Sequence, residues 1–233
     1  TNDMRNIFIA CDTSNTKLVK KIVKNTQFKI KGYKIGYKFG IEFFYSKDGR
    51  QFIKKLKVKN LWLDKKIFDI PNTSFAAIKS LRDLKNISYI TVHISGGLEM
   101  LKAVKKASKI YNKKLKILGV TVLTSFSNSS IKRIGHTKNI KDIVRKQALL
   151  AKKARIDGIV CSAHEIKFIK KICKRMEIIT PGIRLKGQAL DDQKRVKSPR
   201  EAFKSGATSI VMGRSLIKGN IKSNIQKLIK SLN

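Results

Sequence analysis

Hydrophobic positions along the chain fall into short runs, and most runs are followed by a Lys-rich stretch in which apolar residues recur every three or four positions. Short apolar runs are typical of buried strands, and the second spacing is typical of amphipathic helices. The predicted strands are Asn6–Asp12, Phe28–Gly36, Leu61–Asp64, Ile87–Ile94, Leu115–Leu123, Gly158–Ser162, Ile178–Gly182 and Ser209–Gly213. The predicted helices are Thr16–Asn25, Asn72–Leu84, Gly97–Tyr111, Ile140–Arg155, His164–Lys174 and Asn220–Leu232.

Strands that alternate with helices indicate βαβ crossovers and therefore a parallel sheet. We predict one domain over residues 1–233, a closed (β/α)₈ (TIM) barrel of the α/β class, because eight such units fit a chain of 233 residues. No Pro/Gly-rich hinge divides the chain, which has only three prolines. An open, doubly wound α/β sheet is the alternative.

The composition adds that the chain can bury a core. Hydrophobic residues make up 42% of it, which argues against wholesale disorder. No apolar run approaches the roughly 18 residues of a membrane-spanning helix, and the first twelve residues lack the apolar centre of a secretory signal. Cys11, Cys161 and Cys173 fit neither a fully paired disulfide framework nor a metal-type spacing. We therefore expect a cytoplasmic protein.

The charge balance is extreme, with 53 Lys and Arg against 15 Asp and Glu, or +38 at pH 7. A nucleic-acid partner would explain such a charge. However, the bases are spread along the chain, 42 of them are Lys, and aromatic residues are only 7%. Base recognition favours Arg, and stacking platforms need clustered aromatics. We therefore favour a compositional bias toward surface lysine and keep nucleic-acid binding as an alternative function.

Polar residues gather where the predicted strands end. In a (β/α)₈ barrel, the carboxyl ends of the strands and the loops after them carry the functional residues. The residues predicted to meet on this rim are Asp12, Lys34, Asp64, Lys66, His93, Thr124, Arg184, Gly213 and Arg214. We expect one functional site there.

The segment 63–73, LDKKIFDIPNT, is the most specific of these ends. Asp64 and Lys66 are two residues apart, so on a strand their side chains point to the same side. Asp69 has the opposite parity and lies beyond the strand, so a straight strand cannot bring it beside Lys66 within one subunit. Either the chain turns sharply or Asp69 serves another site. Taken alone, Asp69 would also suit a helix cap.

The pattern D-x-K-x-x-D-I-P-N-T in this segment resembles the signature of the orotidine 5′-phosphate decarboxylase family. Further motifs of that family follow in the same order: IACD at 9–12, YKIG at 33–36, TVHISGG at 91–97, VTVLTS at 120–125, VCSAHE at 160–165, TPGIR at 180–184, DQKR at 192–195 and VMGR at 211–214. One D-x-K-x-x-D element would be a weak signal, but an ordered series over nearly the whole chain is specific.

The resemblance implies decarboxylation of orotidine 5′-monophosphate to uridine 5′-monophosphate, the last step of pyrimidine synthesis, with no cofactor and no metal. The family's alternating Lys–Asp–Lys–Asp array maps here to Lys34, Asp64, Lys66 and Asp69. Lys66 would protonate the carbanion left on the ring, and Asp64 would lie against the departing carboxylate. Lys34 and Asp69 would balance the array, so that no buried charge is left unpaired.

The substrate contacts of the family map onto strand ends and loops. The implied substrate-binding residues are Asp12, Lys34, Asp64, Ile70, Thr73, Thr124, Arg184, Gln193, Gly213 and Arg214. By the same resemblance, Asp12 and Lys34 would contact the ribose hydroxyls and Thr124 the pyrimidine. Arg184 and Arg214 suit the phosphate because Arg offers a fixed fork of donors. Gln193 lies in the stretch 185–198, which is long enough to close over phosphate and base.

The family builds its site between two subunits, and the resemblance therefore implies a homodimer. Asp69, Ile70 and Thr73 would be donated across the interface, which agrees with the parity of Asp69. A related Mg²⁺-dependent sugar-phosphate decarboxylase or aldolase is the nearest alternative. Such relatives bind the ion through extra carboxylates at the strand ends, whereas a lysine at position 34 would repel it.

Overall fold

The computed structural model describes residues 4–187 and 197–233, and in these ranges eight parallel strands close into a barrel. Each strand pairs with its neighbours in chain order, and the last pairs with the first. The strands are β1 (Arg5–Ala10), β2 (Tyr33–Phe39), β3 (Leu61–Ile67), β4 (Ile87–His93), β5 (Lys116–Val120), β6 (Gly158–Val160), β7 (Glu177–Thr180) and β8 (Ser209–Met212). The closed order confirms the (β/α)₈ barrel and excludes the open sheet.

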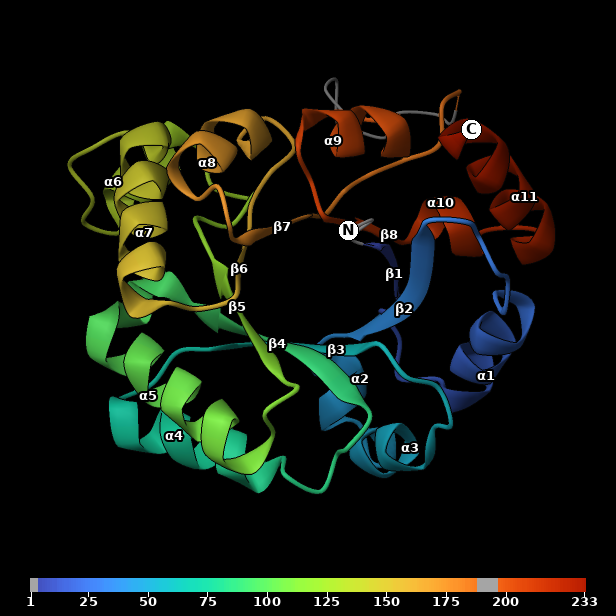
Figure 1. Cartoon of the computed structure of the whole chain (residues 1–233), viewed down its shortest axis with the longest axis horizontal. Helices are drawn as coiled ribbons and strands as arrows, with labels where there is room; N and C mark the ends of the chain where they lie inside the picture. The colour runs from blue at the N-terminus through green and yellow to red at the C-terminus, as the bar shows by residue number, and fades with distance from the viewer. Residues whose placement is uncertain (1–3, 188–196) are drawn as a thin grey trace.

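Helices form a ring around the barrel (Figure 1). The longer ones are α1 (Thr16–Asn25), α4 (Pro71–Ser80), α5 (Gly97–Tyr111), α7 (Ile140–Ala154) and α11 (Ile221–Leu232). The shorter ones are α2 (Ile41–Tyr45), α3 (Gly49–Lys55), the 3₁₀ helix η1 (Ile94–Gly96), α6 (Asn128–Arg133), α8 (Ile166–Ile172), α9 (Pro199–Ser205) and α10 (Arg214–Ile217). The sequence pattern did not predict α2, α3, α6, α9 or α10, which are four to seven residues long. Segments this short rarely show a clear helical period, and of the comparable ones only α8 was predicted.

Local chemistry fixes where several helices begin. The side chain of Asn15 accepts the amide N–H of Leu18 at the start of α1, which satisfies one of the free donors of the first turn. A capping box between Ser198 and Glu201 starts α9, with Pro199 as its first residue. This capping box can be recognised in the sequence, although the helical period of α9 cannot.

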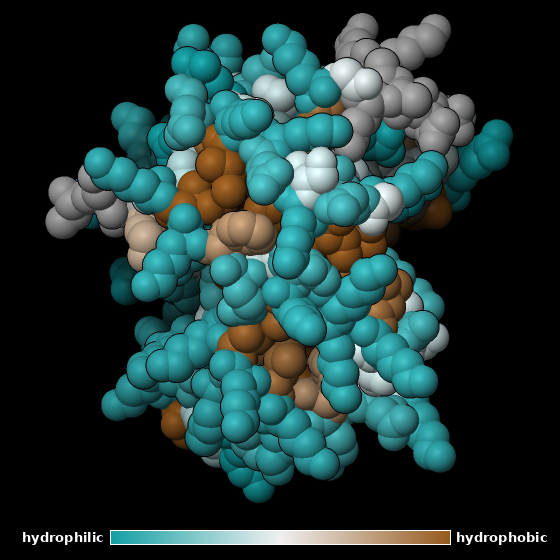
Figure 2. Space-filling view, turned by 90° about the vertical axis from the view of Figure 1, so that its right-hand side faces the viewer, coloured by the Kyte–Doolittle hydropathy of each residue, from teal (hydrophilic) through white to brown (hydrophobic). Residues whose placement is uncertain are grey.

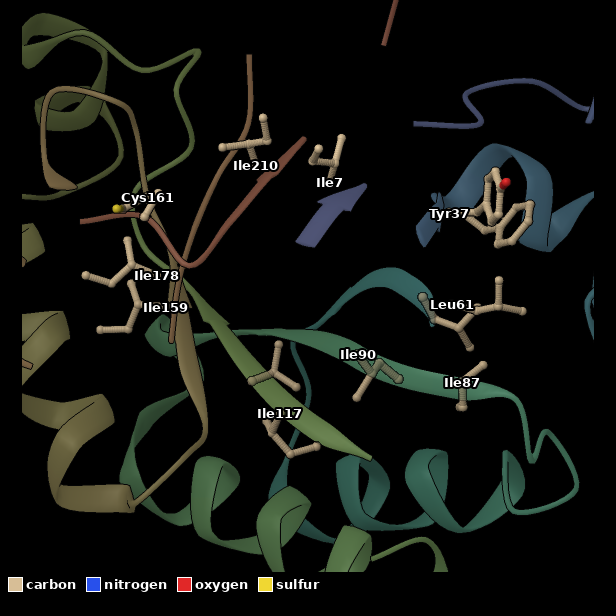
Figure 3. Close-up of a cluster of buried hydrophobic side chains, with 14 of the residues drawn as sticks. Ile7, Tyr37, Leu61, Ile87, Ile90, Ile117, Ile159, Cys161, Ile178 and Ile210 are labelled. Carbon is tan, nitrogen blue, oxygen red and sulfur yellow. The ribbon is translucent and has the colours of Figure 1, made fainter. Parts of the chain in front are cut away.

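Two apolar cores hold the barrel. The larger lies between the strands and the surrounding helices, and Figure 3 shows side chains such as Ile7, Ile90 and Ile117 that the strands contribute to it. The smaller fills the inside of the barrel, where Phe8 packs edge-on against Trp62 and Tyr89 at ring-centroid distances of 5.3 and 5.5 Å. Because side chains fill the middle, ligands can enter only at the two ends of the barrel.

The second strand lies later in the chain than predicted. The prediction was Phe28–Gly36, whereas β2 is Tyr33–Phe39 and ends just before Gly40. Apolar and basic residues alternate on both sides of Gly36, so the period-two pattern identifies the inward face but not the end of the strand. Gly36 is needed where it stands, because a Cβ there would lie 2.5 Å from the backbone oxygen of Asn60.

Within the described residues, no helix is both long and apolar enough to cross a membrane. Figure 2 shows one side of the molecule, where hydrophilic side chains cover most of the surface and leave only small apolar patches. That surface accords with the dispersed lysines of the sequence.

Candidate active site

Asp64, the middle residue of β3, is the centre of a charged cluster at one end of the barrel. Its Oδ2 atom lies 2.8 Å from Nζ of Lys66 and 3.1 Å from Nζ of Lys38. The ammonium of Lys38 also lies 3.6 Å from the carboxylate of Asp12, two residues after β1. The side chains of Asp64 and Lys38 are only 9% and 12% exposed, whereas that of Lys66 is 37% exposed. The cluster thus combines the buried side chains of Asp64 and Lys38 with the ammonium of Lys66, which a ligand can reach.

An irregular backbone places Lys66. The register between β3 and β4 shifts between Leu63 and Ile67, and Lys66 adopts a left-handed conformation with φ of 46°, which costs free energy for a residue with a Cβ. Thr91 of β4 compensates: its hydroxyl accepts the amide N–H of Lys66 at 3.0 Å and donates to Oδ1 of Asp64 at 2.7 Å. The sequence predicted that Asp64 and Lys66 share a side, but not this distortion.

The electrostatics of the cluster keep its carboxylate and its buried ammonium charged. Burial alone would raise the pKa of Asp64, but the charges of Lys38 and Lys66 outweigh it and hold that pKa below its ordinary value. Burial alone would lower the pKa of Lys38, and the carboxylates of Asp64 and Asp12 reverse this and raise it. Around neutral pH, therefore, Asp64 is a carboxylate and Lys38 an ammonium.

The prediction that Lys34 lies beside Asp64 is wrong. Lys34 is the second residue of β2, pairs in register with Asn6 of β1, and lines a cavity at the opposite end of the barrel. Lys38, four residues later on the same face, takes the predicted place. At about 3.3 Å per residue, the two positions are about 13 Å apart along the strand. The error follows from placing the end of β2 too early.

A cavity of about 490 Å³ adjoins the cluster and shares Asp12 and Lys38 with it. Three residues predicted to bind phosphate line this cavity, namely Arg184, Gly213 and Arg214. Neither guanidinium forms an ion pair with a carboxylate that the structure describes. A Cβ at position 213 would meet only Ala10, at 3.7 Å, so nothing crowds the backbone there. Among the described residues, therefore, the two arginines of this wall have no carboxylate partner, which leaves their charge available to an anion.

Two further predicted residues stand apart from this cavity. Thr124 lines a neighbouring cavity of about 760 Å³, which shares Pro181 and Gly182 with the first. Gln193 lies outside the described residues, as does most of the stretch 185–198. Thr124, the predicted pyrimidine contact, thus lies at the same rim in the loop after β5, whereas Arg184 and Arg214 follow β7 and β8.

Asp69, Ile70 and Thr73 lie on the surface, at the start of α4. The carboxylate of Asp69 accepts the amide N–H of Ile70 at 2.7 Å and is not the cap of α4, which begins after Ile70. The apolar side chain of Ile70 is 65% exposed. No interaction of the described residues joins Asp69 to Lys66, in agreement with the parity argument.

Three residues at this site were not given a role by the sequence. Lys38 and Thr91 were missed, and His93, which lines the same cavity as Lys66, was predicted only to reach the rim. The signal for Lys38 was its place on the same strand face as Lys34, just before the chain turns at Gly40. For Thr91 the signal was its place at the start of the family motif TVHISGG, since a buried threonine on a strand is otherwise ordinary.

A closed (β/α)₈ barrel whose rim joins a Lys–Asp–Lys cluster to an arginine-lined cavity has the arrangement of an enzyme active site. A family model described as orotidine 5′-phosphate decarboxylase / HUMPS family matches residues 5–225, so the chain belongs to that family. Together with the relatives that carry the name orotidine 5′-phosphate decarboxylase, this match confirms the decarboxylase (carboxy-lyase) class predicted from the motifs.

Individual relatives agree with the family match. A protein named orotidine 5′-phosphate decarboxylase from Wolbachia sp. subsp. Brugia malayi is 40% identical over 233 residues, which cover 98% of this chain and 100% of that protein. One of the same name from Wolbachia pipientis subsp. Culex pipiens is 41% identical over 199 residues, or 84% of this chain and 86% of that one. The crystal structure of orotidine 5′-phosphate decarboxylase from Lactobacillus acidophilus superposes with a TM-score of 0.83 at 30% identity, covering 98% and 99% of the two chains.

Proposed function

We propose that the protein decarboxylates orotidine 5′-monophosphate to uridine 5′-monophosphate in pyrimidine biosynthesis, with Lys66 as the proton donor. The observation that carries the proposal is the Lys38–Asp64–Lys66 cluster, in which one carboxylate oxygen lies within 3.1 Å of two ammonium groups. It lies at one end of the barrel, beside the cavity of Arg184 and Arg214, with which it shares Lys38.

In the proposed step, the bond between ring carbon C6 and the carboxylate breaks and its electron pair stays on C6 as carbon dioxide leaves. The ammonium of Lys66 then gives a proton to C6 and becomes a neutral amine. A positive charge fixed beside the developing carbanion stabilises it in advance, without rearrangement during the reaction. Because the side chain of Lys66 is 37% exposed, water can return the proton once the product leaves.

Lys38 completes the charge balance in this scheme. When Lys66 loses its proton, the buried carboxylate of Asp64 would be left without a counter-charge, which is costly. Lys38 remains 3.1 Å from Asp64 and keeps it paired. The role that the family resemblance gave to Lys34 therefore passes to Lys38, together with the ribose contact shared with Asp12.

The substrate phosphate would lie against Arg184, Arg214 and the backbone of Gly213. Binding energy from a group remote from the reacting carbon can be used to order the charged cluster and exclude water. The pyrimidine would extend toward the loop of Thr124. The predicted contact of Gln193 stays a proposal of the same kind.

A second copy of the chain would complete the site. Ile41, Tyr45, Phe68 and Ile70 expose between 53% and 71% of their surface on the two segments that follow β2 and β3. The ammonium of Lys65 lies 3.6 Å from the ring centre of Tyr45 and links these segments. An apolar patch beside a charged rim fits a protein interface, across which Asp69, Ile70 and Thr73 would enter the partner's site.

The Mg²⁺-dependent alternative fits this cluster poorly. A divalent ion needs several free oxygen ligands, whereas Lys38 and Lys66 already flank Oδ2 of Asp64 and would repel the ion. A nucleic-acid-binding function would not require the Asp64–Lys66 pair, so it does not explain this cluster.

The test is the loss of ultraviolet absorbance of orotidine 5′-monophosphate when the purified protein is added in the presence of a chelator. We expect turnover, and we expect Lys66→Ala to lose at least about 10²-fold in kcat, the lower limit for a general acid, while it still binds uridine 5′-monophosphate. No absorbance change with the folded wild type would refute the function. Full turnover by Lys66→Ala would refute only the role of Lys66.

A further inference from the structure

A second basic cavity lies at the end of the barrel opposite the active site. It has a volume of about 810 Å³ and is lined by residues at or near the beginnings of the strands, including Asn6 of β1 and Lys34 of β2. Lys34 and the active-site Lys38 mark the two ends of one strand face, about 13 Å apart. A ligand in this cavity would therefore not meet the catalytic cluster.

The charge lining this cavity is unbalanced. Six basic side chains and two carboxylates line it, which leaves four excess positive charges; the bases are Lys34, Lys114, Lys116, Lys170, Lys174 and Arg175. They come from three separate parts of the chain, namely β2, the beginning of β5, and α8 with the turn after it. The excess is thus gathered by the fold and does not belong to one run of lysines.

Both carboxylates are already neutralised. Glu177 lies 2.8 Å from the ammonium of Lys116 and accepts the hydroxyl of Tyr89 at 2.6 Å. Asp157 lies 2.7 Å from the ammonium of Lys105, which is not part of the lining. The other five basic side chains form no ion pair with any carboxylate in the described residues. Like charges around one cavity repel each other, and an anion would relieve this repulsion.

The wall of the cavity can also form hydrogen bonds. Asn60 donates to Asn6, and Asn6 donates in turn to Ser209 inside the barrel, so a network of fixed polar side chains closes this end. The volume falls within the 300–1,000 Å³ typical of small-molecule sites. A polynucleotide, by contrast, needs an extended track of charge with aromatic platforms.

We propose that this cavity binds a compact polyphosphate anion, either an inorganic phosphate chain or the phosphate chain of a nucleoside triphosphate. The ligand places its negative charges among Lys34, Lys174 and Arg175, where the guanidinium of Arg175 can engage two phosphate oxygens. The site is separate from the proposed phosphate cavity of Arg184 and Arg214.

The test is isothermal titration of the full chain with inorganic tripolyphosphate at about 0.15 M salt, where long-range surface effects are screened. The chain carries Arg184→Gln and Arg214→Gln so that the active-site cavity does not contribute. Adding Lys34→Gln, Lys174→Gln and Arg175→Gln should weaken binding at least about tenfold. All three positions are exposed, so the fold should survive, and circular dichroism checks this.

A matched variant removes the same charge elsewhere. Lys17, Lys20 and Lys24 lie exposed on α1, and their replacement by Gln should change the affinity by less than about twofold. Equal weakening by the two triple variants, or no binding by the parent chain, would overturn the proposal. So would an RNA oligonucleotide that binds at this end and is not displaced by tripolyphosphate.

A nucleoside triphosphate separates the two sources of the ligand. If it binds more tightly than tripolyphosphate and loses affinity in the same Lys34, Lys174 and Arg175 variant, the site takes a nucleotide. If the nucleoside triphosphate and tripolyphosphate bind equally tightly, the site recognises only the phosphate chain. Both results support a compact polyphosphate site.

Discussion

The hydroxyl of Thr91 donates a hydrogen bond of 2.7 Å to Asp64. The same oxygen accepts the amide N–H of Lys66 at 3.0 Å, so one fully buried hydroxyl holds both the central carboxylate and the backbone of the proposed proton donor. Because that backbone is left-handed, the hydrogen bond to Thr91 offsets part of the cost of the conformation. Thr91 is thus a positioning residue, which acts through Asp64 and Lys66.

Replacing Thr91 by Val should lower kcat by about 10- to 100-fold, because a displacement of about 1 Å in a reacting group can cost that much. Binding of uridine 5′-monophosphate should change far less, since Thr91 is outside the cavity of Arg184 and Arg214. Thr91→Ser keeps the hydroxyl and should recover most of the rate. Equal losses in the Val and Ser variants would indicate a packing role instead.

Lys38 and Lys34 form a natural pair of test positions, because they lie on the same face of β2 at opposite ends. Lys38→Met should lower kcat/KM at least about 10²-fold, as removal of a preorganised charge does. Lys34→Met, measured in the same assay, should remain within about twofold of the wild type. A larger loss in the Lys34 variant would contradict the arrangement of the cluster.

Mixed dimers test whether sites are shared. Subunits with Asp69→Ala and subunits with Lys66→Ala should each be inactive alone, because every site lacks one of the two groups. After unfolding, mixing in equal amounts and refolding, about half of the dimers are hybrids, and each hybrid has one intact site. The mixture should therefore show about a quarter of the wild-type activity in the absorbance assay. Absence of recovery, with dimers present by light scattering, would argue against sharing.

The stability contributed by Asp64 should depend on pH in a defined direction. Its pKa is held below the ordinary 3.8, so its contribution is complete above that pH and is lost as the pH falls through the lower, folded-state pKa. Lys38, whose pKa is raised above 10.5, contributes fully below that pH and less above it. We expect Asp64→Asn to cost about 3–5 kcal/mol at pH 7, as breaking a buried pair does.

Urea unfolding at a series of pH values measures this difference. The difference in the free energy of unfolding between the wild type and Asp64→Asn should be largest between pH 3.8 and pH 10.5, the ordinary pKa values of the two groups. It should become smaller below and above this range. A gap that stays the same from pH 7 down to pH 2 would mean that packing, and not charge, explains the destabilisation.

Most of the fold could be predicted from sequence patterns. Seven of the predicted strands overlap the observed ones closely, and the longer helices between them show a clear helical period. Leu61–Asp64 and Ser209–Gly213, for example, begin where β3 and β8 begin. The end of the second strand was predicted too early because apolar residues and lysines alternate on both sides of Gly36, from Tyr33 to Phe39. Periodicity reports which face of a strand a residue is on, but it contains no mark for the end.

By itself, the sequence determined the barrel, the family and the Asp64–Lys66 pair, since these follow from local periodicity and from residues close together in the chain. Tertiary structure alone decided that Lys38, and not Lys34, stands beside Asp64, that Thr91 fixes Lys66, and that six basic residues from distant segments surround one cavity. Such relations depend on the register between neighbouring strands and on a local bend in β3. Both arise when strands separated by tens of residues pair in space, and a one-dimensional pattern does not encode that pairing.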